Sequence, residues 1–182
     1  MTRLAPLKPE EMTDEQRKVV SWFRTDLKRE PHLTHLTWLR SPELARHILH
    51  FGHYLRHQSL DFRKRELAIL ITGRVCKSPI EWHLHLPDAR KAGIEDGIIE
   101  QVAAGRRPKF ERSTDDLVYD VCTELLNGFS LSEATYKRAV DMIGHKELVE
   151  LIAITGYYVM MAMLIGAFDY QLPDGVKPAF VD

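Results

Sequence analysis

Apolar side chains recur every three or four residues along nearly the whole chain. In residues 41–57, for example, such a stripe consists of Leu44, Ile48, Phe51 and Leu55. This spacing places side chains on one face of an α-helix, whereas a half-buried strand needs strict alternation of polar and apolar residues. Because no segment alternates clearly, the pattern predicts an all-α fold, a bundle of about seven or eight helices.

Capping residues, prolines and glycines set the expected bounds of these helices. Three Ser/Thr-x-x-Glu/Gln capping boxes begin at Thr13, Ser78 and Ser130. Glycines at positions 93, 105, 128 and 144 are expected to end helices. The expected helices cover residues 13–28, 41–57, 61–76, 78–93, 94–104, 113–127, 130–143 and 146–168. Residues 1–12 are expected to form an extended arm and residues 169–182 an extended tail.

The last expected helix is apolar enough that a membrane span must be considered. From Leu151 to Phe168 the only breaks are a threonine, two glycines and two tyrosines. A single span with no basic flank, after several amphipathic helices, is better interpreted as the buried central helix of a bundle. Tyr157 and Tyr158 give this helix two polar groups that can reach a cavity or a subunit boundary.

Composition narrows the class of protein. The chain has 182 residues, which predicts one domain over 1–182, and its net charge of −1 favours neither a nucleic-acid nor a membrane partner. Two cysteines, Cys76 and Cys122, indicate a reducing compartment without a disulfide framework. The N-terminus has no apolar core of a signal peptide, so we expect a cytoplasmic protein.

Candidate chemistry concentrates between Glu66 and His85. The helix that begins at the N-cap Asp61 is apolar on every side, which predicts a buried helix with Glu66 on or in the core. Burial of an unpaired carboxylate is costly, so we expect Glu66 to have a raised pKa. Gly73 shares its face and leaves room for another group to approach.

The following helix carries the second half of this chemistry. Glu81 and His85 are four residues apart and therefore share a face, whereas His83 points away from both. His83 and His85 cannot bind one metal ion from a regular helix. Pro87 lies inside the helical pattern and is expected to kink it.

Structural interpretations compete with functional ones here. Ser78 and Glu81 form a capping box, and Glu66 has a possible ion-pair partner in a buried arginine such as Arg74. The functional interpretation is that Glu66, Glu81 and His85 converge across two helices as a proton-transfer site.

A histidine stripe precedes this segment. His50, His53 and His57 lie on one side of the expected helix 41–57 at metal-ligand spacing. Because no cysteine or carboxylate completes the set, we favour a solvated or subunit-facing polar surface, and no metal is predicted.

The central segment resembles the motif of the carboxymuconolactone decarboxylase and alkylhydroperoxidase D superfamily. The peroxidase branch has Glu, eleven residues, and Cys-x-x-Cys-x-x-x-His, which match Glu66, Ser78, Glu81 and His85 here, with both cysteines replaced. Residues 81–85 and 87–93 are similar to the decarboxylase-like branch. The resemblance covers residues 43–172 and implies an antiparallel helical core, trimers or hexamers, and no cofactor.

The leading hypothesis is therefore a cofactor-free lyase-like enzyme of aromatic compound catabolism that decarboxylates, isomerises or hydrolyses a small organic acid or lactone. Its predicted catalytic residues are Glu66, Glu81 and His85. The predicted substrate-binding residues are Ser78, Trp82, His83 and Tyr158.

Two alternatives remain open. In the first, the chain is a thiol-independent relic of a peroxidase fold that acts as an oligomeric binding or structural protein. In the second, it is an alkylhydroperoxidase-type antioxidant that uses Cys76.

Overall fold

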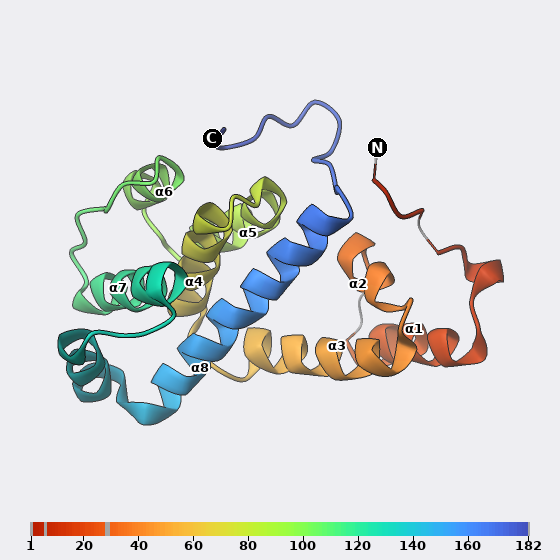
Figure 1. The fold of residues 1–182 in the computed structure, drawn as a ribbon, viewed down its shortest axis with the longest axis horizontal. Helices are drawn as coiled ribbons and strands as arrows, with labels where there is room; N and C mark the ends of the chain where they lie inside the picture. The colour runs from red at the N-terminus through yellow and green to blue at the C-terminus, as the bar shows by residue number, and fades with distance from the viewer. Residues whose placement is uncertain (1, 6, 28–29, 182) are drawn as a thin grey trace.

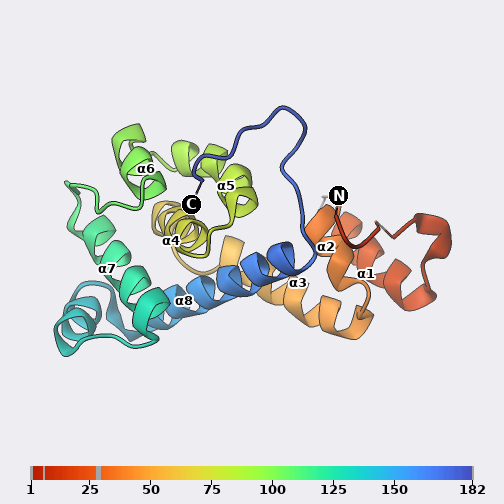
Figure 2. The same cartoon turned by 45° about the horizontal axis from the view of Figure 1, so that its top comes forward.

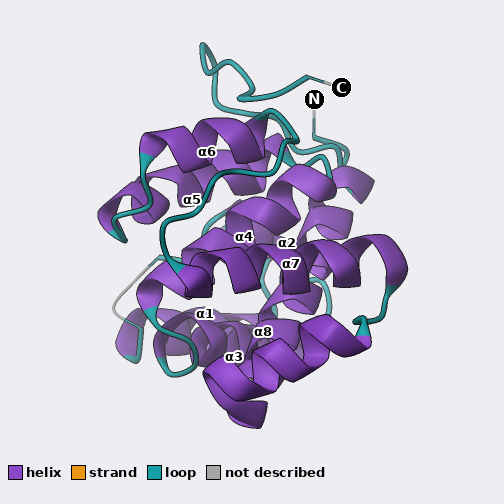
Figure 3. Ribbon diagram, turned by 90° about the vertical axis from the view of Figure 1, so that its left-hand side faces the viewer, coloured by secondary structure: helices purple, strands orange, loops and turns teal. Residues whose placement is uncertain are grey.

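The computed structural model describes residues 2–5, 7–27 and 30–181, and helices dominate them (Figure 1). These residues form eight α-helices and one 3-10 helix without any strand (Figure 3). In chain order they are η1 (Pro9–Glu11), α1 (Asp14–Thr25), α2 (Leu33–Trp38), α3 (Pro42–His57), α4 (Phe62–Val75), α5 (Pro79–Lys91), α6 (Asp96–Ala103), α7 (Ser113–Gly128) and α8 (Glu133–Ala167). The predicted all-α fold is confirmed.

Most helix starts agree with the expected caps, but two capping boxes are wrong. The Thr13 box is present, since the Thr13 hydroxyl accepts from the Gln16 amide at 3.3 Å. Ser78 occupies the cap position of α5 but makes no side-chain capping bond. The α8 cap is Ser132 rather than Ser130, because the Ser132 hydroxyl accepts from the Thr135 amide at 3.2 Å. The capping-box pattern therefore predicts a side-chain bond at Ser78 that is absent, and it places the start of α8 two residues too early.

Gly144 divides α8 into two helical segments, as expected. Its φ of 72° and ψ of 170° lie outside the helical region, in a conformation that side-chain-bearing residues rarely adopt. The second segment then crosses the middle of the molecule as one long helix (Figure 1). Among the described residues, α8 alone is long and apolar enough to cross a membrane, and 61% of its most apolar 18-residue window is buried in the fold. That burial is expected of a core helix.

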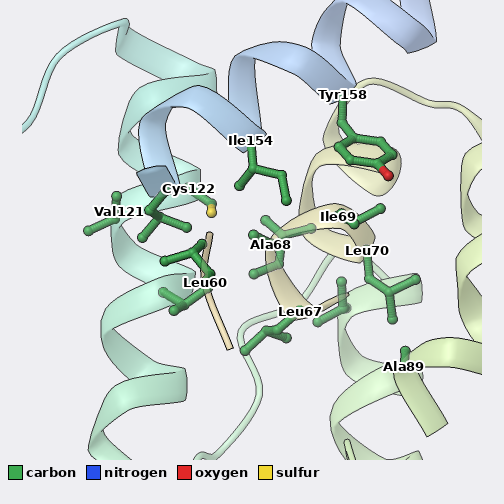
Figure 4. Close-up of a cluster of buried hydrophobic side chains, with 14 of the residues drawn as sticks. Leu60, Leu67, Ala68, Ile69, Leu70, Ala89, Val121, Cys122, Ile154 and Tyr158 are labelled. Atoms are coloured by element: carbon green, nitrogen blue, oxygen red, sulfur yellow. The ribbon is translucent and has the colours of Figure 1, made fainter. Parts of the chain in front are cut away.

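The centre of the main apolar core is α4, which packs against α5, α7 and α8. Its residues 67–71 are all at most 1% exposed, so the prediction of a buried helix is confirmed. Figure 4 shows Leu67 and Ala68 of α4 among Val121 of α7 and Ile154 of α8. Because α4 is enclosed on all sides, any polar side chain that it carries must find a partner within the fold.

The predicted core stripe of α3 is partly wrong. Leu44 and Phe51 are 45% and 42% exposed, whereas the buried positions are Ala45, Leu49, Gly52 and Leu55. Ala45 and Gly52 on the inner face are small and let neighbouring helices approach closely. The prediction relied on the larger Leu44 and Phe51, which point outward. An alanine Cβ at Gly52 would lie 2.3 Å from the Tyr157 hydroxyl, so α3 and α8 meet closely there.

The two ends of the chain return to the body of the protein. The Arg3 amide donates to the Phe168 carbonyl at 2.8 Å, and the arm contains η1 in addition to extended residues. The C-terminal tail is extended as expected and passes over α5 (Figure 2). There the Phe180 ring packs edge-on against Trp82, with centroids 5.5 Å apart. The tail therefore packs against α5 of the same chain.

Candidate active site

Five helices enclose a cavity of about 250 Å³. Residues of α3, α4, α5 and α8 supply most of its wall, and the start of α2 closes one side. The lining residues are His32, Thr34, His35, Arg56, His57, Arg65, Glu66, Glu81, Leu84, His85, Asp88, Tyr157, Tyr158 and Met161. All three predicted catalytic residues thus lie in one cavity.

Glu66 links two cationic groups in the cavity wall. It is only 2% exposed, because it lies on α4 within the core. One carboxylate oxygen is 2.8 Å from His85 Nδ1, and the other accepts from Arg65 Nε at 3.0 Å. Arg74, the partner considered from the sequence, instead donates to the Ala103 carbonyl at 2.8 Å. The predicted convergence of Glu66 and His85 is therefore present in the structure.

The expected rise in the pKa of Glu66 is wrong. Burial by itself would raise this pKa, but the hydrogen bond and charge of His85, together with Arg65, lower it below the ordinary value. Glu66 is therefore an ionised carboxylate. The prediction failed because it treated Glu66 as unpaired, whereas its sequence neighbour Arg65 and the distant His85 both bind its carboxylate.

The bond to Glu66 determines which nitrogen of His85 carries the proton. An ionised carboxylate can only accept, so His85 Nδ1 donates to it, and Nε2 is the nitrogen that carries no hydrogen in the neutral form of the ring. That Nε2 atom is 3.8 Å from Glu81 Oε2. The ring also meets the Tyr158 ring edge-on, with centroids 5.0 Å apart. These contacts hold the imidazole with a proton-accepting nitrogen beside Glu81.

Glu81 is the second carboxyl group of the cavity and its environment is the opposite of that of Glu66. It is 3% exposed and forms no capping bond at the start of α5. Burial raises its pKa, and the nearby charges of His85 and Arg56 only partly offset this effect. Glu81 therefore tends to hold a proton, next to the bare nitrogen of His85.

Only one of the four predicted substrate-binding residues lines the cavity, namely Tyr158. Trp82 is 2% exposed and packs in the core against Phe180. Ser78 is buried at the start of α5, and His83 is half-buried. None of these three belongs to the lining, because α5 turns only residues 81, 84, 85 and 88 toward the cavity. The structure therefore does not bring Ser78, Trp82 or His83 to the cavity.

Sequence reasoning missed Arg56. This side chain lines the cavity from the last turn of α3 and is half-buried. A signal was available, because Arg56 continues the spacing of the buried positions Ala45, Leu49 and Gly52. A charge on the inner face of a helix indicates either a buried ion pair or a binding site.

The histidine stripe of α3 does not form a metal site in the described part of the chain, where no cluster of three or more histidine, cysteine or acidic ligands occurs. His50 stacks on Trp22 with centroids 3.9 Å apart, and His53 packs against His57 at 4.7 Å. His57 also lines the cavity. The stripe is therefore divided between a stacking contact with Trp22 and a His53–His57 pair at the cavity wall.

Neither thiol is placed for redox chemistry. Burial raises the pKa of Cys76, and it raises the pKa of Cys122 to about 12. A peroxidatic cysteine needs a lowered pKa, because the thiolate is the nucleophile. Both cysteines also lie outside the lining of the cavity.

Comparisons with known proteins agree with the motif and the fold. Residues 42–108 match the model of the carboxymuconolactone decarboxylase family. This segment contains α3 to α6, and therefore Arg56, Glu66, Glu81 and His85. No curated protein matches the chain.

Two solved structures share the whole fold. One is described as an uncharacterized peroxidase-related protein from Silicibacter sp. TM1040, with a TM-score of 0.73 and coverage of 93% of this chain and 91% of that one. The other is an uncharacterized peroxidase-related protein from Ralstonia eutropha JMP134, titled alkylhydroperoxidase AhpD core, with a TM-score of 0.75 and coverage of 95% and 93%. Each is 13% identical in sequence, which shows a common fold.

Proposed function

We propose that this chain, which resembles the carboxymuconolactone decarboxylase and alkylhydroperoxidase D superfamily in motif and fold, is an acid/base enzyme. Its substrate is a small organic acid or lactone, and its reaction is a decarboxylation, an isomerisation or a hydrolysis that needs no cofactor. The observation that supports this proposal is the continuous set of Glu66, His85 and Glu81 along one cavity wall.

Each of these three side chains has a distinct role in the proposal. Glu66 stays ionised and orients the imidazole. His85 Nε2 removes a proton from a substrate carbon or from water. Glu81 holds the second proton and donates it, since its pKa is raised. A proton acceptor, His85, and a proton donor, Glu81, would then both reach one bound molecule. Such a pair suits isomerisation and the protonation of a carbanion.

The size of the cavity limits the substrate. The cavity volume of about 250 Å³ lies just below the range of about 300–1,000 Å³ that is typical of small-molecule sites. A monocyclic acid or a short-chain lactone fits this space, whereas a peptide or a nucleotide does not. The expectation of a small-molecule substrate thus has a physical basis.

Three readouts test the proposal, one for each net reaction. The enzyme would be incubated in D₂O with a panel of small unsaturated acids and lactones, and NMR would follow deuterium uptake for isomerisation, carbon dioxide release for decarboxylation and ring opening for hydrolysis. The variants are Glu66→Gln, Glu81→Gln and His85→Gln, each close in shape to the native residue. General acid–base groups contribute about 10²- to 10⁴-fold, so His85→Gln is expected to slow exchange by that factor.

His83→Gln is the matched control, because it alters a histidine of the same helix outside the cavity lining. It is expected to retain the wild-type rate. Exchange that is equally fast in the His85 and His83 variants would refute the catalytic role of His85. If no compound of the panel exchanges, loses carbon dioxide or undergoes ring opening, the binding-protein alternative is favoured over the enzyme.

A further inference from the structure

Helix α8 places two tyrosine hydroxyls in the cavity without a hydrogen-bond acceptor. Tyr157 and Tyr158 are 3% and 2% exposed, and both line the cavity. Both lie beside the Arg56 guanidinium, which can only donate, and neither hydroxyl finds an acceptor at hydrogen-bonding geometry within the described residues. Buried polar groups in folded proteins are almost always hydrogen-bonded, and leaving one unpaired costs stability. Two such groups in one cavity indicate that a ligand supplies the missing acceptor.

Arg56 contributes a third unsatisfied donor from α3. Its Nε is fully enclosed and has no hydrogen-bond partner in the part of the chain that the structure describes. Burial alone would lower its pKa, but the nearby Tyr158, Tyr157 and Glu81 raise it, so the guanidinium keeps its charge. The Arg56 carbonyl meanwhile accepts from the Arg65 side chain, which ties the end of α3 to α4.

The charges of the cavity wall are unevenly balanced. Arg65 has its counter-charge in Glu66, at 3.0 Å. No described carboxylate lies within ion-pair distance of the Arg56 guanidinium. Glu81 is close enough to interact, but its burial favours the neutral form. Arg56 is thus a permanent positive charge facing a cavity with no anion paired to it.

We propose that Arg56, Tyr157 and Tyr158 form a subsite that binds one carboxylate group of the substrate. The planar guanidinium fork matches the two oxygens of a carboxylate, and the two phenol hydroxyls complete its hydrogen bonds. The inference rests on the proposed function and narrows it, because the substrate is then an organic acid and not a neutral lactone. Because the Tyr158 ring touches His85, this carboxylate lies next to the proton-transfer group.

The position of Tyr157 between α3 and α8 supports a binding role for its hydroxyl. Gly52 provides the space for it, since a Cβ at this position would lie 2.3 Å from the hydroxyl oxygen. Glycine in a helix interior destabilises the helix relative to alanine. In return the phenol enters between α3 and α8 and reaches the same cavity as Arg56.

Binding of an inert acid tests the subsite without any turnover. Benzoate and benzamide have nearly the same shape but differ in charge, and calorimetric titration of the whole chain at constant ionic strength compares them. The wild-type protein is expected to bind benzoate and to bind benzamide at least tenfold more weakly. Hydrogen bonds to charged groups are worth enough that Arg56→Gln and Tyr158→Phe are each expected to weaken benzoate about ten- to hundredfold.

Tyr136→Phe is the control, since it removes a phenol hydroxyl of α8 that is outside the cavity lining. If Arg56→Gln fails to fold, the two variants Tyr157→Phe and Tyr158→Phe decide the matter, because they remove only an oxygen. Equal affinity for benzoate and benzamide would overturn the subsite, as would benzoate binding that none of the variants weakens. Inorganic phosphate that competes as strongly as benzoate would overturn the carboxylate assignment.

The subsite and the catalytic proposal fail separately. His85→Gln leaves the three donors in place, so benzoate binding in this background is expected still to depend on Arg56. If benzoate binding depends on Arg56 but no reaction is catalysed, the subsite is supported and the proposal of an enzyme is refuted. If catalysis depends on His85 but benzoate binding does not change in Arg56→Gln, the proposal of an enzyme is supported and the subsite is refuted.

Discussion

Glu66 and Glu81 are both buried glutamates of one cavity, yet their neighbours separate their proton affinities. Glu66 accepts from His85 and Arg65, which stabilise its charge and lower its pKa. Glu81 has no described hydrogen-bond partner of its own, so the cost of burying a charge dominates and its pKa is raised. Paired titratable groups with divergent pKa values are typical of acid/base sites.

Substitution of each glutamate by glutamine is expected to change the pH dependence of stability in opposite directions. The raised pKa of Glu81 stabilises the folded state below the ordinary value of 4.5, and this contribution is lost as pH rises through the folded pKa. Glu81→Gln therefore gains stability relative to the wild type as pH rises. The measurement is urea unfolding over a pH series that begins below the ordinary carboxyl range.

The expectation for Glu66→Gln has the other sign. The lowered pKa of Glu66 stabilises the fold above 4.5, and that contribution is lost as pH falls through the folded pKa. The variant breaks a buried pair and is expected to lose about 3–5 kcal/mol near neutral pH, with a smaller loss in acid. If both variants change stability in the same direction across the series, the assignment of the two protonation states is wrong.

At the scale of the elements, two glycines lie where the helices around the cavity meet. Gly52 of α3 faces the Tyr157 hydroxyl of α8, and Gly73 of α4 faces the first turn of α5. At Gly73 an added Cβ would be 3.5 Å from the Trp82 amide and 3.6 Å from the Glu81 Cβ, which are ordinary contacts. The room expected beside Gly73 is therefore occupied by the helix that carries Glu81.

Alanine substitutions at these glycines are expected to differ sharply. Gly52→Ala forces Tyr157 to move, and overpacking of this kind typically costs about 1–3 kcal/mol. Gly73→Ala gains helix propensity of up to about 1 kcal/mol and meets no clash. Thermal unfolding compares the two variants with the wild type.

Loss of benzoate affinity in Gly52→Ala alone would link this packing contact to the proposed subsite. Comparable melting temperatures for the two variants would show that the α3–α8 approach is less tight than the geometry indicates.

At the scale of the whole molecule, α3 connects two apolar clusters. Leu55 belongs to the main cluster around α4, whereas Ala45 and Leu49 belong to a smaller cluster with α1 and α2. Arg56 lies at the main-cluster end of this helix, where the cavity opens. The expected single domain is consistent with this shared helix and stays a prediction, as does the cytoplasmic location.

Self-association, which the family resemblance implies, has a plausible surface on α8. Val149, Ile152 and Met163 are 64%, 42% and 68% exposed, and their spacing places them on one stripe of the helix with Gly156. Val149→Asp and Ile152→Asp are expected to reduce a trimer or hexamer toward the monomer, because a second copy would bury the new charge. Light scattering after size-exclusion chromatography gives the mass.

Val181→Asp is the control, since this exposed apolar residue lies in the tail. A wild-type protein that is already monomeric would contradict the expectation outright. An oligomer that resists both α8 substitutions would place its interface elsewhere.

Local pattern was sufficient for the helices and for part of the site. Spacing of apolar residues, together with Asp61 and the glycines, predicts where helices begin and end, because those preferences act within a few residues. The shared face of Glu81 and His85 also follows from helical geometry alone. The family motif added that Glu66 meets His85, which the structure confirms at 2.8 Å.

Tertiary structure decided what periodicity cannot express. Which face of α3 is inward depends on the helices that pack against it, and this face carries Arg56 into the cavity. The pKa of Glu66 depends on Arg65 and His85, whose charges outweigh the cost of burial only after folding. Electrostatic environment and helix contacts are sums over residues distant in sequence, so the chain specifies them only through its folded form.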